Sequence, residues 1–467
     1  MVERVLLLTV ATHMTHELER FIESAEHFGY DYEILGLGQE WVGGAAENGR
    51  LIFPGGGMKV NLLKNYISDV DDDTIILFTD SYDVVFADGP ESIINRWSSM
   101  GGGMIFTAEK TCWPEPHLSK VYPNSPYDYR YLNSGGFVGR AEDIKRLIET
   151  KCEDSDDDQL YYTLKFLNSE GITLDYECDI FQTLNSSFDD VEIHNGSVFN
   201  RVTKTYPTVI HANGGVGPRT FLNKLYNNMI KPKHNLKVLR GDERVMVQLV
   251  FDFQHSNPSV IMDTIEYLTY DKKLIDLIVF NNNRLNDWAI DNFIQKFKDQ
   301  YHSVKYHYID DEGVYELRET ALEYATGYDG DYVLQIDANH KLNNHDTIQL
   351  LMEENRDIVA PMINVEQSLN SNFWGGVDGN GYFQESDNYF PIRNYEDKGT
   401  FVVPFIKGVI MFKKEILNHK VFTLLYENNR DDEFYGDDYF VVFCNALRNS
   451  NLFMYVTNKR YYGKYFE

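Results

Sequence analysis

One short segment joins the pattern of a buried strand to a pair of carboxylates. Ile75 to Thr79 is an apolar run, and Asp80 and Asp83 follow it with Tyr82 between them. A continuous apolar run is typical of a buried parallel strand, and open α/β sheets bind ligands at the carboxyl ends of such strands. Two carboxylates there can hold a divalent cation, which can neutralise a diphosphate. For this segment alone, an acidic turn without a ligand is the simpler alternative.

Strands and helices alternate along the first half of the chain. The predicted elements are a strand over 5–11, a helix over 16–28, a strand over 32–37, a helix over 58–67, a strand ending at residue 80, a helix over 90–97 and a strand over 104–108. This alternation predicts a parallel, doubly wound α/β sheet.

The same pattern starts again after a polar stretch at 231–235. Strands are predicted over 245–251, 277–281 and 332–337, with amphipathic helices over 288–297 and 317–324. The last of these strands again ends in an acid, Asp337. We therefore predict two tandem α/β units, residues 1–235 and 236–467, as suits a chain of 467 residues.

Composition narrows the classes of partner. The chain has 43 basic and 72 acidic residues, for a net charge of -29. Such a surface repels nucleic acid and anionic membranes, and it attracts cations and basic polypeptides. No apolar run approaches the ~20 residues that span a bilayer, and the N-terminal apolar stretch is too short for a signal peptide. We expect a soluble, untargeted protein.

The cysteines do not form a recognisable framework. They are widely scattered and no two have CxxC spacing: Cys112, Cys152, Cys178 and Cys444. Zinc binding and a disulfide-rich fold are therefore not indicated, although a single bridge stays open.

Two features could bind parts of a nucleotide. Trp41, in a loop after the second strand, and Tyr82 could sandwich a planar base, or the Trp could simply close the edge of the domain. The glycines at 55–57 precede a helix and could expose backbone N–H groups to phosphate, with Lys59 nearby. Alternatively, this run is a mobile loop and Lys59 faces solvent.

Three further features could bind a sugar or a metal. Asn133 is predicted on a tight turn within 131–137, where its amide could bond sugar hydroxyls. The acids at 156–158 could do the same or mark a helix N-terminus. His211 ends a predicted strand and could complete a Mn²⁺-type site beside the two acids, although a lone His is more often structural.

Together these stretches resemble the glycosyltransferase and accessory domains of the multifunctional procollagen lysyl hydroxylases, the collagen hydroxylysine glucosyltransferases. The resemblance lies in residues 9–12, 35–41, 55–60, 80–83, 112–115, 132–137, 157–160, 211–214, 353–356, 358–362 and 371–375. It implies two tandem GT-A-like (Rossmann-type) α/β domains, a catalytic one over 1–235 and an accessory, non-catalytic one over 236–467.

The resemblance also implies roles for individual residues. Asp80, Asp83 and His211 correspond to Mn²⁺ ligands. Val10, Thr12, Trp41, Ser81 and Tyr82 correspond to the uridine pocket, and Gly214 corresponds to the diphosphate loop. We add three residues to this nucleotide-binding group from the chain itself: Lys59 at the glycine-rich helix entry, the metal ligand Asp80, and Arg219, as the cation of the longer segment after His211. The positions around the transferred sugar and its acceptor, taken as the catalytic group, are Trp113, Asn133, Asp157, Asp158 and Asn213.

The implied activity is a Mn²⁺-dependent, retaining transfer of glucose from UDP-glucose to hydroxylysine or galactosyl-hydroxylysine of collagen-like polypeptides. The implied compartment is the secretory pathway, in the endoplasmic reticulum. Two alternatives stay open: a hydroxylysine transferase that uses UDP-galactose, and a non-catalytic scaffold that binds sugar or collagen.

The chain departs from the family pattern in three places. The segment 215–219 beside the diphosphate is longer than its counterpart. After residue 400 there is no pattern of two His and a carboxylate for iron, so lysine hydroxylation is not expected. The second unit has Asp337 without a later His-x-Asn-Gly turn, so we expect no metal there.

Overall fold

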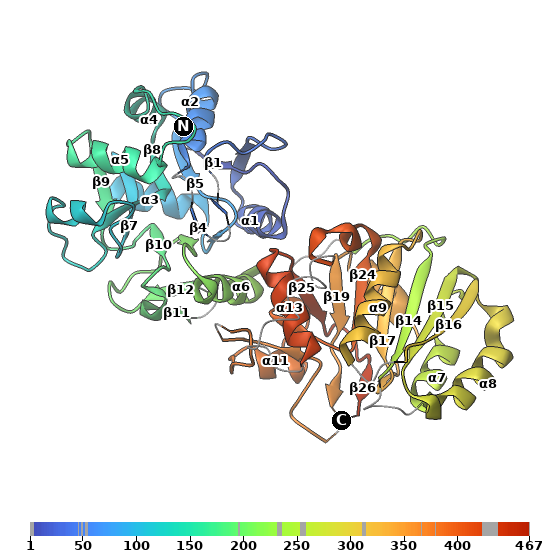
Figure 1. Cartoon of the computed structure of the whole chain (residues 1–467). Helices are drawn as coiled ribbons and strands as arrows, with labels where there is room; N and C mark the ends of the chain where they lie inside the picture. The colour runs from blue at the N-terminus through green and yellow to red at the C-terminus, as the bar shows by residue number, and fades with distance from the viewer. Residues whose placement is uncertain are drawn as a thin grey trace. The chain divides into compact units, whose positions relative to one another are not determined.

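The computed structural model describes residues 4–44, 46–47, 50–51, 55–194, 197–230, 236–252, 258–310, 314–365, 367–378, 380–422 and 438–466. The chain divides into two compact units, Met1–Ile230 and Lys231–Glu467. Figure 1 colours the first from blue to green and the second from yellow-green to red. The polar stretch at 231–235, where we predicted the boundary, lies outside the described residues.

The described elements of unit 1 follow the predicted alternation closely. In chain order they are β1 (Val5–Val10), α1 (His16–His27), β2 (Asp31–Leu35), β3 (Ala46–Glu47), β4 (Arg50–Leu51), α2 (Gly57–Ile67), β5 (Ile75–Thr79), β6 (Val84–Phe86), α3 (Pro90–Ser99), β7 (Met104–Glu109), η1 (Pro116–Lys120), β8 (Tyr131–Arg140), α4 (Ala141–Leu147), α5 (Asp158–Leu167), β9 (Ile172–Asp175), β10 (Phe181–Thr183), η2 (Phe188–Asp190), β11 (Val191–His194), β12 (Ser197–Asn200), β13 (Val209–His211) and α6 (Val216–Ile230).

The main sheet of unit 1 is mixed, which corrects the prediction of a wholly parallel sheet. Its order is β2-β1-β5-β8-β7-β9. β1 is parallel to β2 and β5, whereas β8 is antiparallel to both β5 and β7. A parallel pair needs a crossover that usually contains a helix. Between β7 and β8 the chain has only the short η1 and loops, and it returns in the opposite direction.

Helices cover both faces of this sheet. Alternate residues of β1 and β5 point to opposite faces, as the pleat requires. The side chains on one face, such as Leu7 and Leu77, pack with α1 and α3. Those on the other face, such as Leu8 and Ile76, pack with α2, α4 and α5. The sheet is therefore buried on both faces, and its ligands can reach it only at an edge or at the strand ends.

Unit 2 repeats the design with a larger sheet. Its described elements are β14 (Val245–Phe251), α7 (Pro258–Tyr267), η3 (Lys272–Leu274), β15 (Ile275–Asn281), η4 (Arg284–Asn286), α8 (Asp287–Phe297), η5 (Lys298–Gln300), β16 (Ser303–Tyr308), α9 (Val314–Thr326), β17 (Tyr332–Asp337), β18 (His340–Leu342), α10 (Thr347–Glu353), β19 (Ile358–Pro361), β20 (Asn364–Val365), β21 (Phe373–Trp374), α11 (Tyr389–Arg393), β22 (Thr400–Val403), β23 (Phe405–Ile406), β24 (Val409–Lys413), η6 (Lys414–Asn418), α13 (Tyr439–Asn449), β25 (Met454–Thr457) and β26 (Gly463–Tyr465). The sheet order is β16-β15-β14-β17-β24-β19-β25-β22.

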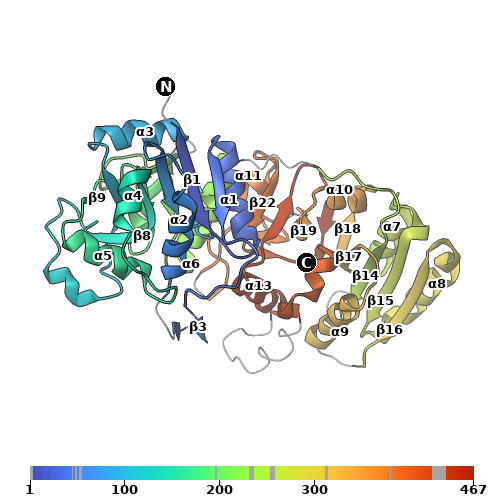
Figure 2. The same cartoon turned by 90° about the horizontal axis from the view of Figure 1, so that it is seen from above.

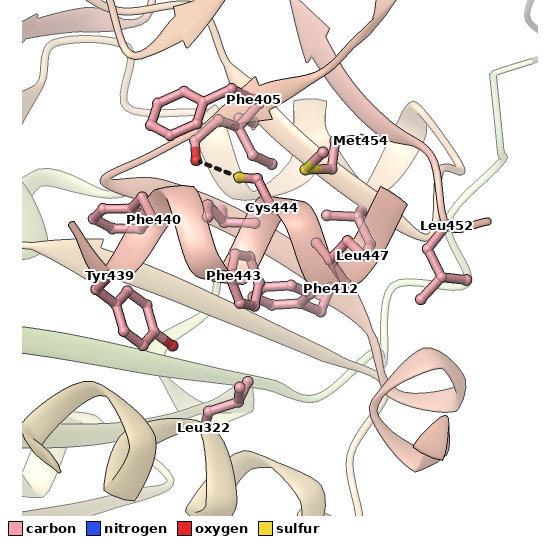
Figure 3. Close-up of a cluster of buried hydrophobic side chains, with 14 of the residues drawn as sticks. Leu322, Phe405, Phe412, Tyr439, Phe440, Phe443, Cys444, Leu447, Leu452 and Met454 are labelled. Carbon is pink, nitrogen blue, oxygen red and sulfur yellow. Dashed lines mark hydrogen bonds between the residues drawn. The ribbon is translucent and has the colours of Figure 1, made fainter. Parts of the chain in front are cut away.

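The two faces of this larger sheet are also covered. In Figure 2, α7 and α10 lie on one side of the sheet and α9 and α13 on the other. α9 and α13 share one hydrophobic cluster with the sheet. Figure 3 shows part of it, with Cys444 of α13 donating from Sγ to the carbonyl oxygen of Ile406 at 3.4 Å. Burial raises the pKa of the Cys444 thiol to about 12, so this cysteine serves as a packing residue.

The cysteines and the helices bear on two of the sequence predictions. All four cysteines are free thiols, so the structure contains no disulfide bridge between them. None of the helices in the described residues is long and apolar enough to cross a membrane.

Candidate functional site

Three potential metal ligands converge at the carboxyl end of β5. Asp80 and Asp83 follow that strand directly, and His211 is the last residue of β13. One ligand atom from each lies within 4.8 Å of the other two, and no comparable group of His, Cys, Asp or Glu occurs in the described part of the chain. The His211 Nε2 atom lies 3.3 Å from Oδ2 of Asp83 and 3.8 Å from Oδ2 of Asp80. The sequence prediction thus placed these three side chains together.

Backbone contacts hold the cluster in place. The Asp80 N–H donates to the carbonyl oxygen of Gly135 at 2.9 Å, and the Ala212 N–H donates to that of Asp83 at 2.7 Å. A Cβ on Gly135 would lie 2.2 Å from Cε1 of His211 and 2.9 Å from Oδ2 of Asp80. Only glycine therefore lets β8 approach the cluster this closely.

The charges around the cluster lower the pKa of Asp83 and raise that of His211, so the site favours a bound positive charge. Burial opposes ionisation of Asp83, but His211, Arg219 and Lys59 outweigh it and lower its pKa to about 2. Burial also opposes charge on His211, and the neighbouring carboxylates outweigh that effect and raise its pKa. The site thus favours positive charge between the three side chains, and a metal ion would compete there with the His211 proton.

The donor set fits a divalent metal such as Mn²⁺. Carboxylate oxygens and an imidazole nitrogen suit first-row ions of intermediate softness. The ligand atoms already face one another, and the second nitrogen of the ring, Nδ1 of His211, is buried without a partner among the described residues. The three residues could hold the ion and leave further coordination positions for other ligands.

Lys59 links the metal cluster to the acids at the start of α5. Its Nζ atom lies 2.8 Å from Oδ1 of Asp80 and 2.8 Å from Oδ2 of Asp158. Burial opposes the charge of Lys59, yet the two carboxylates outweigh it and raise its pKa. The alternative in which Lys59 faces solvent is wrong, because its side chain is only 17% exposed.

The N–H groups of Gly56, Gly57 and Met58, at the start of α2, are already bonded to backbone carbonyl oxygens. The N–H of Gly56 donates to Gly43, that of Gly57 to Asp156 and that of Met58 to Asp154. A phosphate cradle on these three groups is therefore not available in this conformation. The glycines instead permit close packing, since a Cβ on Gly56 would lie 2.1 Å from Oδ1 of Asp158.

A buried carboxylate that the sequence analysis missed binds two of the residues that were predicted to surround the transferred sugar, Asn133 and Asn213. Glu109 ends β7 and is 2% exposed. Its Oε1 accepts from Nε2 of Gln159 at 2.8 Å and from Nδ2 of Asn133 at 3.1 Å, and its Oε2 accepts from Nδ2 of Asn213 at 3.2 Å. Burial raises its pKa, although these amide donors oppose the rise. An acid directly after an apolar strand was the available signal, as it was for Asp80.

Asn133 lies within a strand, which corrects its predicted position on a tight turn. β8 has an irregularity there: Phe106 of β7 pairs with Phe137, and the next residue, Thr107, pairs with Asn133. The extra residues on β8 form a bulge, a feature that re-aims side chains next to functional sites. The Asn133 Oδ1 atom accepts from the N–H of Gly135, and its Nδ2 donates to Glu109.

Of the other residues predicted around the sugar, Asp157 and Asp158 make contacts within the protein, whereas the Trp113 side chain is exposed. Asp157 is the N-cap of α5 and accepts from the N–H of Leu160 at 2.7 Å, as the helix-terminus alternative predicted. Asp158, in the first turn, engages Lys59 instead. Trp113 is 51% exposed, and its carbonyl oxygen accepts from Nε2 of Gln159 at 3.2 Å. Its indole is thus available to a ligand.

Four of the predicted nucleotide residues lie together at the ends of β1 and β5. The Ser81 hydroxyl donates to the carbonyl oxygen of Val10 at 2.9 Å. The N–H groups of Thr12 and His13 donate to the Tyr82 hydroxyl, each at 3.2 Å. Trp41 is 38% exposed, and its indole N–H donates to Gly44 at 3.0 Å.

The longer segment after His211 forms the start of α6. Gly214 adopts a φ of 108°, in the left-handed region that favours glycine, and α6 begins two residues later at Val216. Pro218 lies in the first turn, where the missing N–H costs no helical bond. Arg219 follows and lowers the pKa of Asp83, so its charge acts on the metal cluster.

Comparison with known proteins identifies the family. The family profile described as "PLOD GT domain" matches residues 1–237. The chain belongs to the PLOD glycosyltransferase-domain family. A second profile, "Glycosyltransferase family 25, N-terminal domain", matches residues 310–467. The chain thus contains two GT-A-like α/β units of glycosyltransferase type in tandem, and its sequence is of the PLOD type. The resemblance implied both features.

Curated relatives match almost the whole chain. Procollagen-lysine,2-oxoglutarate 5-dioxygenase 1 from Gallus gallus is 33% identical over 99% of this chain and 66% of its own length. The multifunctional procollagen lysine hydroxylase and glycosyltransferase from Caenorhabditis elegans is 30% identical over 98% of this chain and 65% of its own length. The chain thus spans just under two thirds of the length of these relatives.

Solved structures give a more distant match. A crystal structure of GalNAc-T7 with UDP, GalNAc and Mn²⁺ is 15% identical over 50% of this chain and 45% of its own, with a TM-score of 0.33.

Proposed function

We propose that unit 1 transfers glucose from UDP-glucose to galactosyl-hydroxylysine of collagen-like polypeptides, with retention of configuration and with Mn²⁺ at Asp80, Asp83 and His211. The observation that carries this proposal is the meeting of that cluster with the Glu109 amide network around Gly135. Membership of the PLOD glycosyltransferase-domain family supplies the reaction class. The relative from Caenorhabditis elegans, named as both a hydroxylase and a glycosyltransferase, supports the collagen acceptor.

The nucleotide would bind at the ends of β1 and β5. Val10, Thr12, Ser81 and Tyr82 would surround the uridine, and Trp41 would stack on the base from its loop. Arg219, Gly214 and the start of α6 at Val216 would face the diphosphate, where the helix dipole favours negative charge. Lys59 would keep Asp80 oriented while its contact with Asp158 fixes the sugar side. When bound, Mn²⁺ would neutralise the departing diphosphate.

The sugar and acceptor would lie beside the Glu109 network. Glu109 orients the amides of Asn133 and Asn213. The Nδ2 atom of Asn213 has one hydrogen-bond acceptor among the described residues, so its second N–H could donate to a sugar hydroxyl. Asp158 would stabilise positive charge that develops at the anomeric carbon or orient the acceptor hydroxyl, and Trp113 would pack against a sugar ring. A preorganised set of dipoles of this kind acts without rearranging during the reaction.

The acceptor and the compartment follow from charge and family. A net charge of -29 suits a polypeptide rich in Lys and Arg, as collagen-type sequences are. We place the protein in the secretory pathway, where such acceptors are made. We also assign residues 1–235 as the catalytic domain and 236–467 as an accessory domain without turnover.

The test is an assay that varies donor and acceptor together. UDP-glucose and UDP-galactose are each incubated with a hydroxylysine peptide, with and without attached galactose, in the presence and absence of Mn²⁺. We expect UDP release and a mass gain of one hexose only with UDP-glucose, Mn²⁺ and the galactosylated peptide. Transfer from UDP-galactose to bare hydroxylysine would favour the alternative transferase. No transfer in any combination would favour the non-catalytic scaffold.

A further inference from the structure

Unit 2 contains a strand end that matches the metal-binding strand end of unit 1. In unit 1, β5 lies between the parallel β1 and the antiparallel β8; in unit 2, β17 lies between the parallel β14 and the antiparallel β24. The Asp80 N–H donates to Gly135 at 2.9 Å, and the Asp337 N–H donates to Gly408 at 2.8 Å. Asp337 therefore occupies the position of Asp80.

The helix that precedes each of these strands supplies a basic residue to the acid. In unit 1 this is Lys59 of α2, and in unit 2 it is Arg318 of α9. Lys59 donates to Oδ1 of Asp80 at 2.8 Å, while Oδ2 of Asp80 faces His211. Lysine thus leaves one carboxylate oxygen directed at the metal cluster.

Arg318 uses both oxygens of its partner. Its Nη1 donates to Oδ1 of Asp337 at 2.6 Å, and its Nη2 donates to Oδ2 at 3.0 Å. Nη2 also lies 3.1 Å from Oδ2 of Asp252, which directly follows β14. A planar guanidinium matches a carboxylate in this two-pronged way, whereas an ammonium acts as a point charge.

The group of three is closed to water. The side chains of Arg318, Asp252 and Asp337 are 4%, 8% and 10% exposed. The ring of Phe440 covers the guanidinium, with its centroid 4.6 Å from Cζ. A charge buried in this way is stable only because its partners are in contact with it.

We propose that Arg318 is a built-in cation that takes the place of a divalent metal in unit 2 and excludes metal-bound nucleotide from that sheet edge. This inference rests on the proposed metal site of unit 1, because the comparison defines what Arg318 replaces. In agreement, the one group of potential metal ligands in the described residues is that of unit 1. Unit 2 thus keeps an acid, Asp337, at the position of Asp80, but both of its carboxylate oxygens are bonded to Arg318.

The first experiment counts bound Mn²⁺ by equilibrium dialysis in the full chain. We expect one ion in the wild-type protein, one in Asp337→Asn and none in Asp83→Asn. A second ion that is lost in Asp337→Asn would overturn the inference about Arg318. Absence of any ion from the wild-type protein would instead overturn the metal site of the proposed function.

The second experiment removes the guanidinium in the Asp83→Asn background, so that unit 1 does not contribute. Arg318→Met removes the cation that both buried carboxylates contact, and we expect the Tm to fall by about 10 °C. Mn²⁺ alone should restore part of this loss, and adding Asp337→Asn should remove the restoration. If Mn²⁺ raises the Tm of the Arg318→Met protein no more than that of its Asp83→Asn parent, the inference is wrong. If this variant does not fold, the Asp337→Asn count still decides.

Discussion

Asp80 and Asp337 end equivalent strands, and they differ in how the neighbouring cation meets them. Lys59 touches one oxygen of Asp80, and the other oxygen faces His211. Arg318 takes both oxygens of Asp337. The two units therefore share a fold but offer a ligand different numbers of free oxygens. Function on a fold is set by such contacts and not by the topology, because the same sheet can end in an open or in a satisfied acid.

The second difference lies in the residues around each acid. Asp80 has Asp83 three residues later and His211 from β13 within reach. Asp337 has Asp252, whose oxygen is already bonded to Arg318. A metal ion needs ligand atoms that lie close together and can give up their protons and partners to it, and among the described residues only unit 1 brings three such side chains together.

The largest expected effect is on UDP binding and turnover, and it should follow substitution at the strand end of unit 1 but not at that of unit 2. Asp83→Asn removes a metal ligand, so Mn²⁺-dependent UDP binding should be lost and turnover should fall by at least ~10²–10³. Calorimetry with UDP, with and without Mn²⁺, measures the binding. Asp337→Asn is the matched control; it should destabilise unit 2 but keep UDP binding and turnover. Loss of UDP affinity in a folded Asp337→Asn protein would place a nucleotide site in unit 2.

Substitutions on the sugar side should reduce transfer without affecting the metal. Asp158→Asn and Trp113→Ala should each lower turnover by about 10²-fold, because each removes a contact made near the reacting sugar. UDP should still bind in the presence of Mn²⁺, since Lys59 keeps its contact with Asp80. Asp157→Asn is the control, because asparagine remains a good N-cap for α5. Full turnover in Asp158→Asn would contradict the proposed position of the sugar.

Glu109→Gln should have a smaller effect, on the order of 10-fold to 10²-fold in kcat. The new amide group places a donor against the donors of Asn133, Gln159 and Asn213, so the network must rearrange. Mn²⁺ binding should remain normal, because Glu109 is not among the three ligands. Steady-state kinetics with saturating Mn²⁺ measures the change, and Glu115→Gln, at a more exposed acid, serves as the control. An unchanged kcat would mean that the network only supports the fold.

The smallest expected effect is a pH dependence of metal binding. The carboxylates raise the pKa of His211 above its usual value, so the metal-free folded protein holds this proton more tightly than the unfolded chain. The resulting stabilisation is present below pH ~6.5 and is lost as pH rises through the raised pKa. Because Mn²⁺ displaces the proton, its affinity should increase with pH by up to about tenfold per unit in that window. Calorimetry in buffers of different ionisation enthalpy should detect proton release, and a pH-independent affinity would count against His211 as a ligand.

Local pattern was sufficient for the strands that end in acids. The predicted strands over 245–251 and 332–337 match β14 and β17, and the run before Asp80 matches β5. These strands are buried on both faces, so their sequences are mostly apolar, with one buried glutamine each in β14 and β17. His211 was predicted beside the two acids because it ends a strand. In the structure that strand, β13, belongs to a separate three-stranded sheet, and it reaches the acids by pairing with β6, where His211 lies opposite Val84, the residue directly after Asp83.

Contacts that join distant parts of the sequence were not accessible in the same way. The antiparallel direction of β8 depends on a connection without a crossover helix, and its bulge has no composition of its own. The sequence left open whether Lys59 faces solvent, because its partner Asp80 lies 21 positions away and comes beside it only in the fold. The sequence analysis did not single out Arg318, whose partner Asp337 lies 19 positions away. Glu109 gave a signal at the end of β7, but its amide partners come from three other segments.

The strand β8 fixes the distance between the Glu109 amide network and the metal cluster. Asn133, which contacts Glu109, and Gly135, which contacts Asp80 and leaves space for His211, are separated by one residue of the same strand. The distance between the amide network at Glu109 and the carboxylate of Asp80 is therefore set by a short length of strand backbone. Under the proposed function, this spacing would set the distance between the groups that bind the hexose and those that bind the diphosphate of the donor.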